Sequence, residues 1–191
     1  DVYGLLLENR PPALRTLAPE RTVYVTSVSK TLAPGLRLGF LLAPPMLHAR
    51  LLDAQHTLLL GAPTPGARLF RHWLKAGLAD RAVRFQRAET AARHALAREV
   101  LGPLAPNAQG AGHHLWLRLP GRWRAGALVD RLKTADVHVL AGDLFAYGRA
   151  RVPHALRLSL SAAGDRASLE RALRMLRHTV EHDARGHEVV A

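Results

Sequence analysis

Residues 27–39 read Ser-Val-Ser-Lys-Thr-Leu-Ala-Pro-Gly-Leu-Arg-Leu-Gly and are the most informative part of the sequence. They begin inside residues 22–29, a run of β-branched, aromatic and serine residues that predicts a strand. Pro34 and Gly35 then break the chain, and residues 38–43 predict a second short strand. A lysine at the end of a buried strand is partly desolvated, which favours the neutral amine that attacks carbonyls. Lys30 is therefore a candidate for Schiff-base chemistry.

Hydroxyls and a guanidinium flank this lysine in the sequence. Ser27 and Ser29 supply hydroxyls at the same strand end, and Arg37 follows the turn. A guanidinium suits the geometry of a phosphate group. The amine, the hydroxyls and the arginine together suit an aldehyde that carries a phosphate.

The pattern S-x-S-K-x-x-x-P-G-L-R-x-G resembles the lysine segment of class I/II aminotransferases, which have fold type I and use pyridoxal 5'-phosphate. The resemblance implies that Lys30 holds the cofactor as an internal aldimine. It also implies that Lys30 moves a proton between the substrate Cα and the cofactor C4′. Ser27, Ser29 and Arg37 would bind the cofactor phosphate.

Two further segments agree with this resemblance. Asp1-Val-Tyr3 resembles the family's D-x-Y, in which the Asp pairs with the pyridine nitrogen and the Tyr hydroxyl contacts the phenolic oxygen. Residues 155–161 resemble the strand whose arginine binds the substrate α-carboxylate, which makes Arg157 the substrate-binding candidate. Residues 143–147 resemble the active-site loop, so Phe145 or Tyr147 could touch the substrate.

The rest of the chain predicts an α/β fold. Helices are expected at 45–60, 67–77, 80–101, 125–135 and 166–182, and further strands at 114–119, 137–140 and 155–160. The resemblance implies two domains in the chain. Residues 1–78 would be the remnant of the large cofactor-binding domain, and residues 79–191 a small C-terminal domain with helices on one side of its sheet. His113 and His114 beside Trp116 could line the substrate path, but we expect a strand entry with Trp116 buried.

The family's motifs that precede D-x-Y are a glycine-containing phosphate loop, an aromatic that stacks on the ring and an asparagine. None of these is in the sequence. The chain, which starts at Asp1 without a Met, therefore looks like the C-terminal part of a larger fold. We expect unpaired strand edges, and poor folding and cofactor binding by this part alone.

Two functional classes share these residues. One is an aminotransferase that acts on an α-amino acid and a 2-oxo acid; the other is the effector-sensing domain of a MocR-type regulator of the GntR family. Residues 29–39 and 114–120 look most like the aminotransferase-like domain of these regulators, although α-aminoadipate-type transaminases share much of the first segment. In the regulator, DNA would be bound only by a winged-helix module preceding this chain. An inactive fragment is the third reading, and a homodimer is implied by the resemblance alone.

Composition limits the other possibilities. The chain has 191 residues, no Cys and a formal net charge of +12 from 27 Lys plus Arg and 15 Asp plus Glu. The basic residues are scattered along helices, which is typical of solvated faces, although nucleic-acid contact stays open. Without a membrane span, the cytoplasm is the default location.

One segment near the end of the chain resembles a metal-binding motif. His178-Thr-Val-Glu-His182 matches the H-x-x-E-H of some zinc peptidases, but no third ligand is in view and we expect no metal site.

Overall fold

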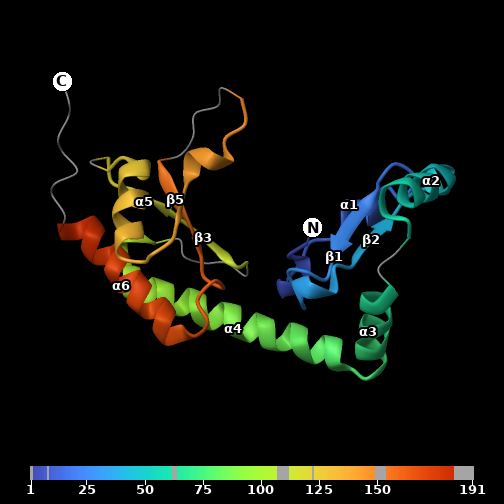
Figure 1. The fold of residues 1–191 in the computed structure, drawn as a ribbon, viewed down its shortest axis with the longest axis horizontal. Coiled ribbons are helices and arrows are strands. Elements are labelled where there is room, and N and C mark those ends of the chain that lie inside the picture. The colour runs from blue at the N-terminus through green and yellow to red at the C-terminus, as the bar shows by residue number, and fades with distance from the viewer. Residues whose placement is uncertain are drawn as a thin grey trace. The chain divides into compact units, whose positions relative to one another are not determined.

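The computed structural model describes residues 2–7, 9–61, 64–106, 112–121, 123–148 and 154–182 (Figure 1). Contacts between residues divide the chain into two compact units, residues 1–88 and residues 89–191. The boundary lies inside α4 (Leu78–Leu101), further along the chain than the expected boundary after residue 78. The assignment of the two parts to a cofactor-binding domain and a small domain stays a prediction.

The first unit contains a two-stranded antiparallel sheet. β1 (Tyr24–Ser27) pairs with β2 (Gly39–Leu42) in a register that sets Tyr24 opposite Leu42 and Ser27 opposite Gly39. β1 is shorter than the run of strand-forming residues predicted, because the chain turns at Val28 instead of extending to residue 29.

Short helices surround this hairpin in the sequence. They are η1 (Gly4–Leu6), α1 (Leu14–Leu17), η2 (Pro34–Leu36), η3 (Pro45–Leu47), α2 (His48–Leu59) and α3 (Thr64–Lys75). A small core of Val28, Leu36 and Leu38 packs against Ala67, Phe70 and Trp73 of α3. α3 therefore supports the turn that carries the lysine motif.

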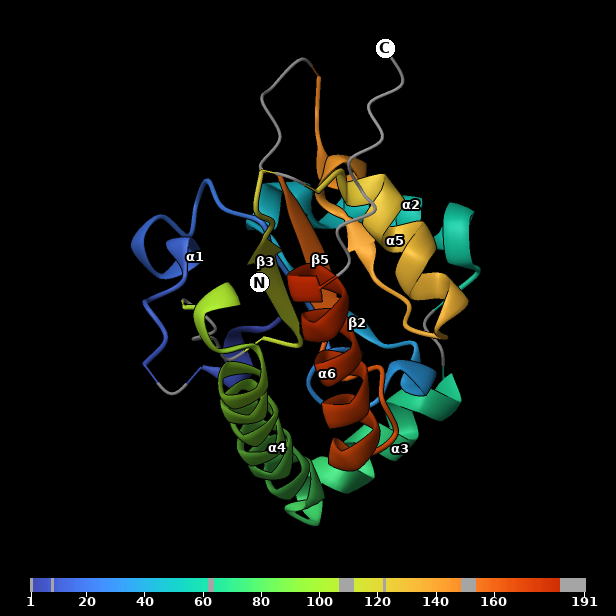
Figure 2. The same cartoon turned by 90° about the vertical axis from the view of Figure 1, so that its left-hand side faces the viewer.

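The second unit is a three-stranded antiparallel sheet with helices on one face. Its strand order is β3-β5-β4, with bounds β3 (His114–Arg118), β5 (Ala155–Ser159) and β4 (Leu140–Ala141). α5 (Ala125–Thr134), α6 (Arg166–His182) and the end of α4 cover one face, as Figure 2 shows, with η4 (Gly102–Leu104) and η5 (Gly142–Phe145) in the connections. The core includes Leu115, Leu117, Leu156 and Leu158 from the strands and Val100, Leu128 and Leu173 from the helices. The opposite face presents the alternate side chains, including Trp116 and Arg157.

Two expectations about the second unit are wrong. The strand expected at 137–140 is reduced to Leu140–Ala141, because the N–H of Val137 instead donates to the carbonyl of Leu132 and completes the end of α5 (3.0 Å). Trp116 is 48% exposed, whereas Trp123 is buried and donates its indole N–H to the carbonyl of Val180 (3.1 Å). Trp116 points to the uncovered face because it alternates with Leu115 and Leu117.

Within the described ranges, none of the helices combines the length and the hydropathy that crossing a membrane requires.

Candidate functional site

The end of the β1–β2 hairpin gathers the motif residues. Ser27 is the last residue of β1 and lies opposite Gly39, which follows Arg37 by two residues. Lys30 and Ser29 lie in the turn after β1. The antiparallel register thus returns the arginine to the strand end that carries the serine, with the lysine in the connecting turn.

One carbonyl organises this turn. The oxygen of Val28 accepts hydrogen bonds from the backbone N–H groups of Thr31, Leu32 and Ala33, at 3.4, 2.9 and 3.2 Å. The N–H of Val28 itself donates to the carbonyl of Leu38 (3.2 Å) and closes the loop. Pro34 then begins η2, where its fixed φ suits the first helical position.

Arg37 ends η2 in the left-handed conformation, with φ 48° and ψ 38°. This conformation costs roughly 1–2 kcal/mol for a residue with a Cβ, and glycine takes it more readily. The N–H of Arg37 donates to the carbonyl of Pro34 (3.3 Å), so the backbone is fixed while the side chain is exposed. Leu60 and Asp136 also have positive φ among the described non-glycine residues, so this backbone conformation alone does not assign a role to the Arg37 side chain.

Lys30 is exposed, which corrects the expectation of a lysine desolvated by its strand. In the described part of the chain, β1 pairs only with β2, and Val25 of β1 is 56% exposed. These residues alone therefore do not bury the amine. The side chain beside it behaves differently, because Thr31 is 1% exposed and its hydroxyl has no hydrogen-bond partner in the described structure.

The D-x-Y segment is described only in part. Tyr3 is half-buried at the N-cap of η1, and its carbonyl accepts the N–H of Leu6 (2.8 Å). Asp1 lies outside the described residues. The roles expected for both residues stay predictions.

Arg157 lies in the middle strand of the second unit, on the face without helices. Its cross-strand neighbours are Trp116 on β3 and Leu140 on β4. The guanidinium carbon lies 4.5 Å from the centre of the Phe145 ring, and Phe145 meets Trp116 edge-on at 5.3 Å and 81°. The Nε of Arg157 is buried and lacks a hydrogen-bond partner within the described ranges.

A buried arginine holds the end of the same strand. Arg93 of α4 donates through Nη1 to the carbonyls of Leu160 and Ala163, at 2.7 and 2.8 Å, and through Nε to Glu89 (2.7 Å). Arg166 of α6 also binds Glu89 (2.6 Å). Hydrogen bonds from Arg166 and then Arg93 lower the pKa of Glu89 to about 2 from 4.5. This Glu89 clamp ties α4, α6 and the end of β5 together.

Comparison with protein families matches residues 2–176 to the family described as Aminotransferase class I and II. The chain belongs to this family. The resemblance seen in the lysine segment thus extends over nearly the whole sequence, and so does the fold, which matches solved aminotransferases.

Individual members of the aminotransferase family include both enzymes and regulators. The 2-aminoadipate transaminase of Thermus thermophilus is 33% identical over 187 residues, covering 92% of this chain and 46% of that protein. The HTH-type transcriptional regulator TauR of Rhodobacter capsulatus is 32% identical over 180 residues, covering 90% of this chain and 36% of that protein. YdeF of Bacillus subtilis, an uncharacterised HTH-type regulator, is 27% identical, covering 94% of this chain and 39% of that protein.

Among solved structures, the α-aminoadipate aminotransferase LysN of Thermus thermophilus superposes with a TM-score of 0.81 and 28% identity, over 94% of this chain and 48% of that one. The LysN structure contains N-(5'-phosphopyridoxyl)-L-leucine. This aminotransferase-family chain spans less than half the length of each of these relatives.

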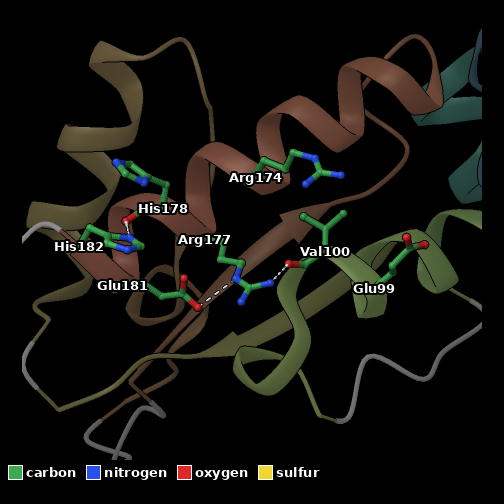
Figure 3. Close-up of a pocket in the computed structure, with 7 residues that line it drawn as sticks. All are labelled: Glu99, Val100, Arg174, Arg177, His178, Glu181 and His182. Carbon is green, nitrogen blue, oxygen red and sulfur yellow. Dashed lines mark hydrogen bonds and ion pairs between the residues drawn. The ribbon is translucent and has the colours of Figure 1, made fainter.

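The H-x-x-E-H segment of the chain lies on α6 and borders a pocket of about 350 Å³ (Figure 3). The rings of His178 and His182 stack at 4.7 Å, while Glu181 pairs with Arg177 (2.9 Å). Arg177 also donates to the carbonyl of Val100 (3.1 Å). No group of three or more metal-binding side chains is found among the described residues.

The sequence did not predict the Glu89 clamp or the contact between the Phe145 ring and Arg157. The i,i+4 spacing of Glu89 and Arg93 was a visible signal, but it is common on helices and does not specify a tertiary partner. The contact of Phe145 with Arg157 joins residues of two separate segments, and only the folded chain reveals it.

Proposed function

We propose that this chain is the C-terminal part of a pyridoxal-phosphate-binding, aminotransferase-like protein that moves an amino group between an α-amino acid and a 2-oxo acid. The main support is the hairpin end that gathers Ser27, Lys30 and Arg37, in a chain of the aminotransferase family. LysN, which shares this fold, binds a phosphopyridoxyl compound.

The residues of the hairpin end fit a phosphorylated aldehyde. Two serine hydroxyls and the Arg37 guanidinium are donors suited to phosphate oxygens, and the Lys30 amine is suited to the carbonyl carbon. The sequence has no Asp or Glu between Glu20 and Asp53, so no nearby carboxylate in this segment repels an anion.

In this proposal each residue has a defined task. Ser27, Ser29 and Arg37 would bind the phosphate, and Lys30 would move a proton from the amino-acid Cα to the cofactor C4′. Arg157 binds the substrate α-carboxylate. When bound, pyridoxal phosphate supplies an electron-withdrawing ring that stabilises negative charge at Cα.

The N-terminal segment has a supporting role by resemblance. Asp1 would keep the pyridine nitrogen protonated, and the Tyr3 hydroxyl would contact the phenolic oxygen of the cofactor. These assignments come from the D-x-Y motif; the family match begins at residue 2 and therefore includes Tyr3 but not Asp1.

Covalent labelling tests the role of Lys30. The chain contains only three lysines, Lys30, Lys75 and Lys133. After incubation of the full-length protein with pyridoxal phosphate and reduction with borohydride, peptide mass spectrometry should find the pyridoxyl group on Lys30. Lys30→Ala should lose this label, whereas Lys75→Ala and Lys133→Ala should keep it. Equal labelling of all three lysines would contradict a built site, and no labelling would favour the inactive fragment.

A regulatory function is the second candidate, because TauR and YdeF are HTH-type regulators. In that case the same residues would sense the cofactor or an amino compound, and DNA would be bound by a preceding winged-helix module. The reading frame upstream of the codon for Asp1 separates the candidates. A winged-helix segment there would overturn the enzyme, and an aminotransferase N-terminal half with no winged-helix segment before it would overturn the regulator. In either protein we propose a cytoplasmic homodimer.

A further inference from the structure

Arg157 is held against an aromatic pair that belongs to two other elements. Phe145 comes from η5 and Trp116 from β3, and Trp116 is also the cross-strand neighbour of Arg157. The guanidinium carbon lies 4.5 Å from the Phe145 ring centre, a distance at which the ring quadrupole attracts a cation. Trp116 meets the Phe145 ring in an edge-to-face arrangement, which is a favoured geometry for an aromatic pair.

Burial of the Nε atom limits how a ligand can reach this guanidinium. The Nε is inaccessible to solvent and has no hydrogen-bond partner among the residues described, although the residue as a whole is only half-buried. The side-on fork made by Nε and one terminal nitrogen is therefore closed. A carboxylate can approach only through the two terminal Nη atoms.

We propose that Phe145, supported by Trp116, is a positioning residue that fixes Arg157 to receive a carboxylate end-on through its two Nη atoms. The inference rests on the proposed function, because it takes Arg157 as the carboxylate receptor. It goes beyond that function by naming the residues that orient the receptor and the edge of the guanidinium that binds.

The chemistry of the guanidinium explains why a ring suits this task. Its π face can stack on an aromatic ring while all of its N–H groups point outward in the guanidinium plane, so stacking and carboxylate binding do not compete. A long arginine side chain otherwise loses rotamer entropy when it binds. Because Arg157 already stacks on Phe145 in the free protein, its side chain loses that rotamer entropy before the carboxylate binds, and its guanidinium is preorganised.

The first test needs no cofactor and uses the ¹⁵N-labelled full chain. The Arg157 Nε–H resonance is identified by its absence in Arg157→Lys. In the wild type it should be shifted by the ring current and exchange slowly with water. Phe145→Leu should remove the ring-current shift and speed exchange by about tenfold, whereas Phe145→Tyr should retain both properties. Tyr147→Leu is the matched control, because Tyr147 lies in the same loop and is 95% exposed.

The second test measures the carboxylate itself. Titration with acetate, at constant ionic strength, should shift the Nη resonances of Arg157 while the Nε–H stays protected, and neutral acetamide should shift neither. Phe145→Leu should weaken acetate binding about fivefold, equivalent to about 1 kcal/mol, and Phe145→Tyr should not. Thermal melting of each variant should change little, since Phe145 is 44% exposed.

The outcomes distinguish the carboxylate-binding role of Arg157 from the positioning role of Phe145. If acetate leaves Arg157 unchanged in the wild type, the carboxylate role within the proposed function is wrong and the positioning role is wrong with it. If acetate binds the wild type and Phe145→Leu equally, only the positioning role is overturned. If acetate abolishes the protection of Nε–H, binding is side-on and the end-on geometry is wrong.

Discussion

The Glu89 clamp should make a large and pH-dependent contribution to the stability of the second unit. The side chains of Glu89 and Arg93 are only 21% and 10% exposed, and Arg93 also holds the carbonyls of Leu160 and Ala163. Glu89→Gln removes the carboxylate charge with little change of shape. It leaves Arg93 as a buried cation without its counter-charge, which is a costly state.

The pKa of Glu89 sets the size and sign of the effect. A fall from 4.5 to about 2 corresponds to at most about 3.5 kcal/mol of stability, since one pKa unit is worth about 1.4 kcal/mol. Arg166 is 55% exposed, so solvent screens its part, and we expect Glu89→Gln to cost about 2 kcal/mol at pH 7. Because the folded-state pKa is depressed, this stabilisation is complete above pH 4.5 and is lost as the pH falls to about 2.

Urea denaturation at several pH values measures this contribution. In a Trp73→Phe background the remaining tryptophans, Trp116 and Trp123, both report on residues 89–191. The free energy of unfolding of the wild type should exceed that of Glu89→Gln by about 2 kcal/mol at pH 7, and the difference should shrink toward pH 2.

Glu170→Gln is the matched control for the Glu89 substitution. Glu170 also pairs with an arginine at i,i+4, namely Arg174, but the two side chains are 38% and 67% exposed. Its loss should cost under about 0.5 kcal/mol. Equal costs for the two substitutions, or a difference between wild type and Glu89→Gln that does not change with pH, would refute the buried clamp.

Three further substitutions test the packing around the candidate sites. Gly66→Ala should lower the melting temperature of the first unit and disturb the Lys30 turn, because the added Cβ would clash with the carbonyl oxygen of Leu36. Gly126→Ala is the control, because a Cβ added there meets nothing within 4 Å, and it should leave the melting temperature unchanged. Arg37→Gly should raise the free energy of unfolding by about 1 kcal/mol, because glycine adopts the left-handed conformation at lower cost. The same substitution should weaken the binding of pyridoxal phosphate. A lower free energy of unfolding would contradict the claim that the backbone at Arg37 is strained. Leu156→Ala, at a fully buried position, should destabilise the second unit by about 2–5 kcal/mol in urea denaturation, and a cost below about 1 kcal/mol would show that the core collapses around the gap.

The sequence predicted most elements because their signals are local. The run before Lys30, the Pro-Gly break after it and the helical spacing of apolar residues in α4 and α6 each depend on neighbouring residues only. The helices expected at 45–60, 80–101 and 166–182 are accordingly present with nearly the expected bounds. The lysine motif was found for the same reason, because its residues lie within thirteen consecutive positions.

Burial was harder to predict because it depends on which face of an element meets a partner. Alternation alone placed Trp116 and Leu115 on opposite faces of their strand, but it did not say which face the helices cover. The expected desolvation of Lys30 likewise required neighbours on both sides of β1, and in the described residues β1 pairs only with β2. Strand periodicity predicts the difference between two faces, and tertiary packing decides which of them is buried.

The excess of arginine also has a structural explanation that composition could not supply. Arg15, Arg87, Arg93 and Arg177 each donate hydrogen bonds to backbone carbonyls, those of Thr22, Leu5, Leu160 and Val100 among them. A carbonyl satisfies the donor without cancelling its charge, so carbonyl contacts such as those of Arg15 and Arg87 are compatible with the net charge of +12, whereas Arg93 and Arg177 also pair with Glu89 and Glu181. Arginine serves this purpose better than lysine because its five N–H groups can bridge several carbonyls from one side chain, as Arg93 does with Leu160 and Ala163. Part of the positive charge therefore reflects how the chain holds its own backbone, and the charge by itself does not argue for a nucleic-acid partner.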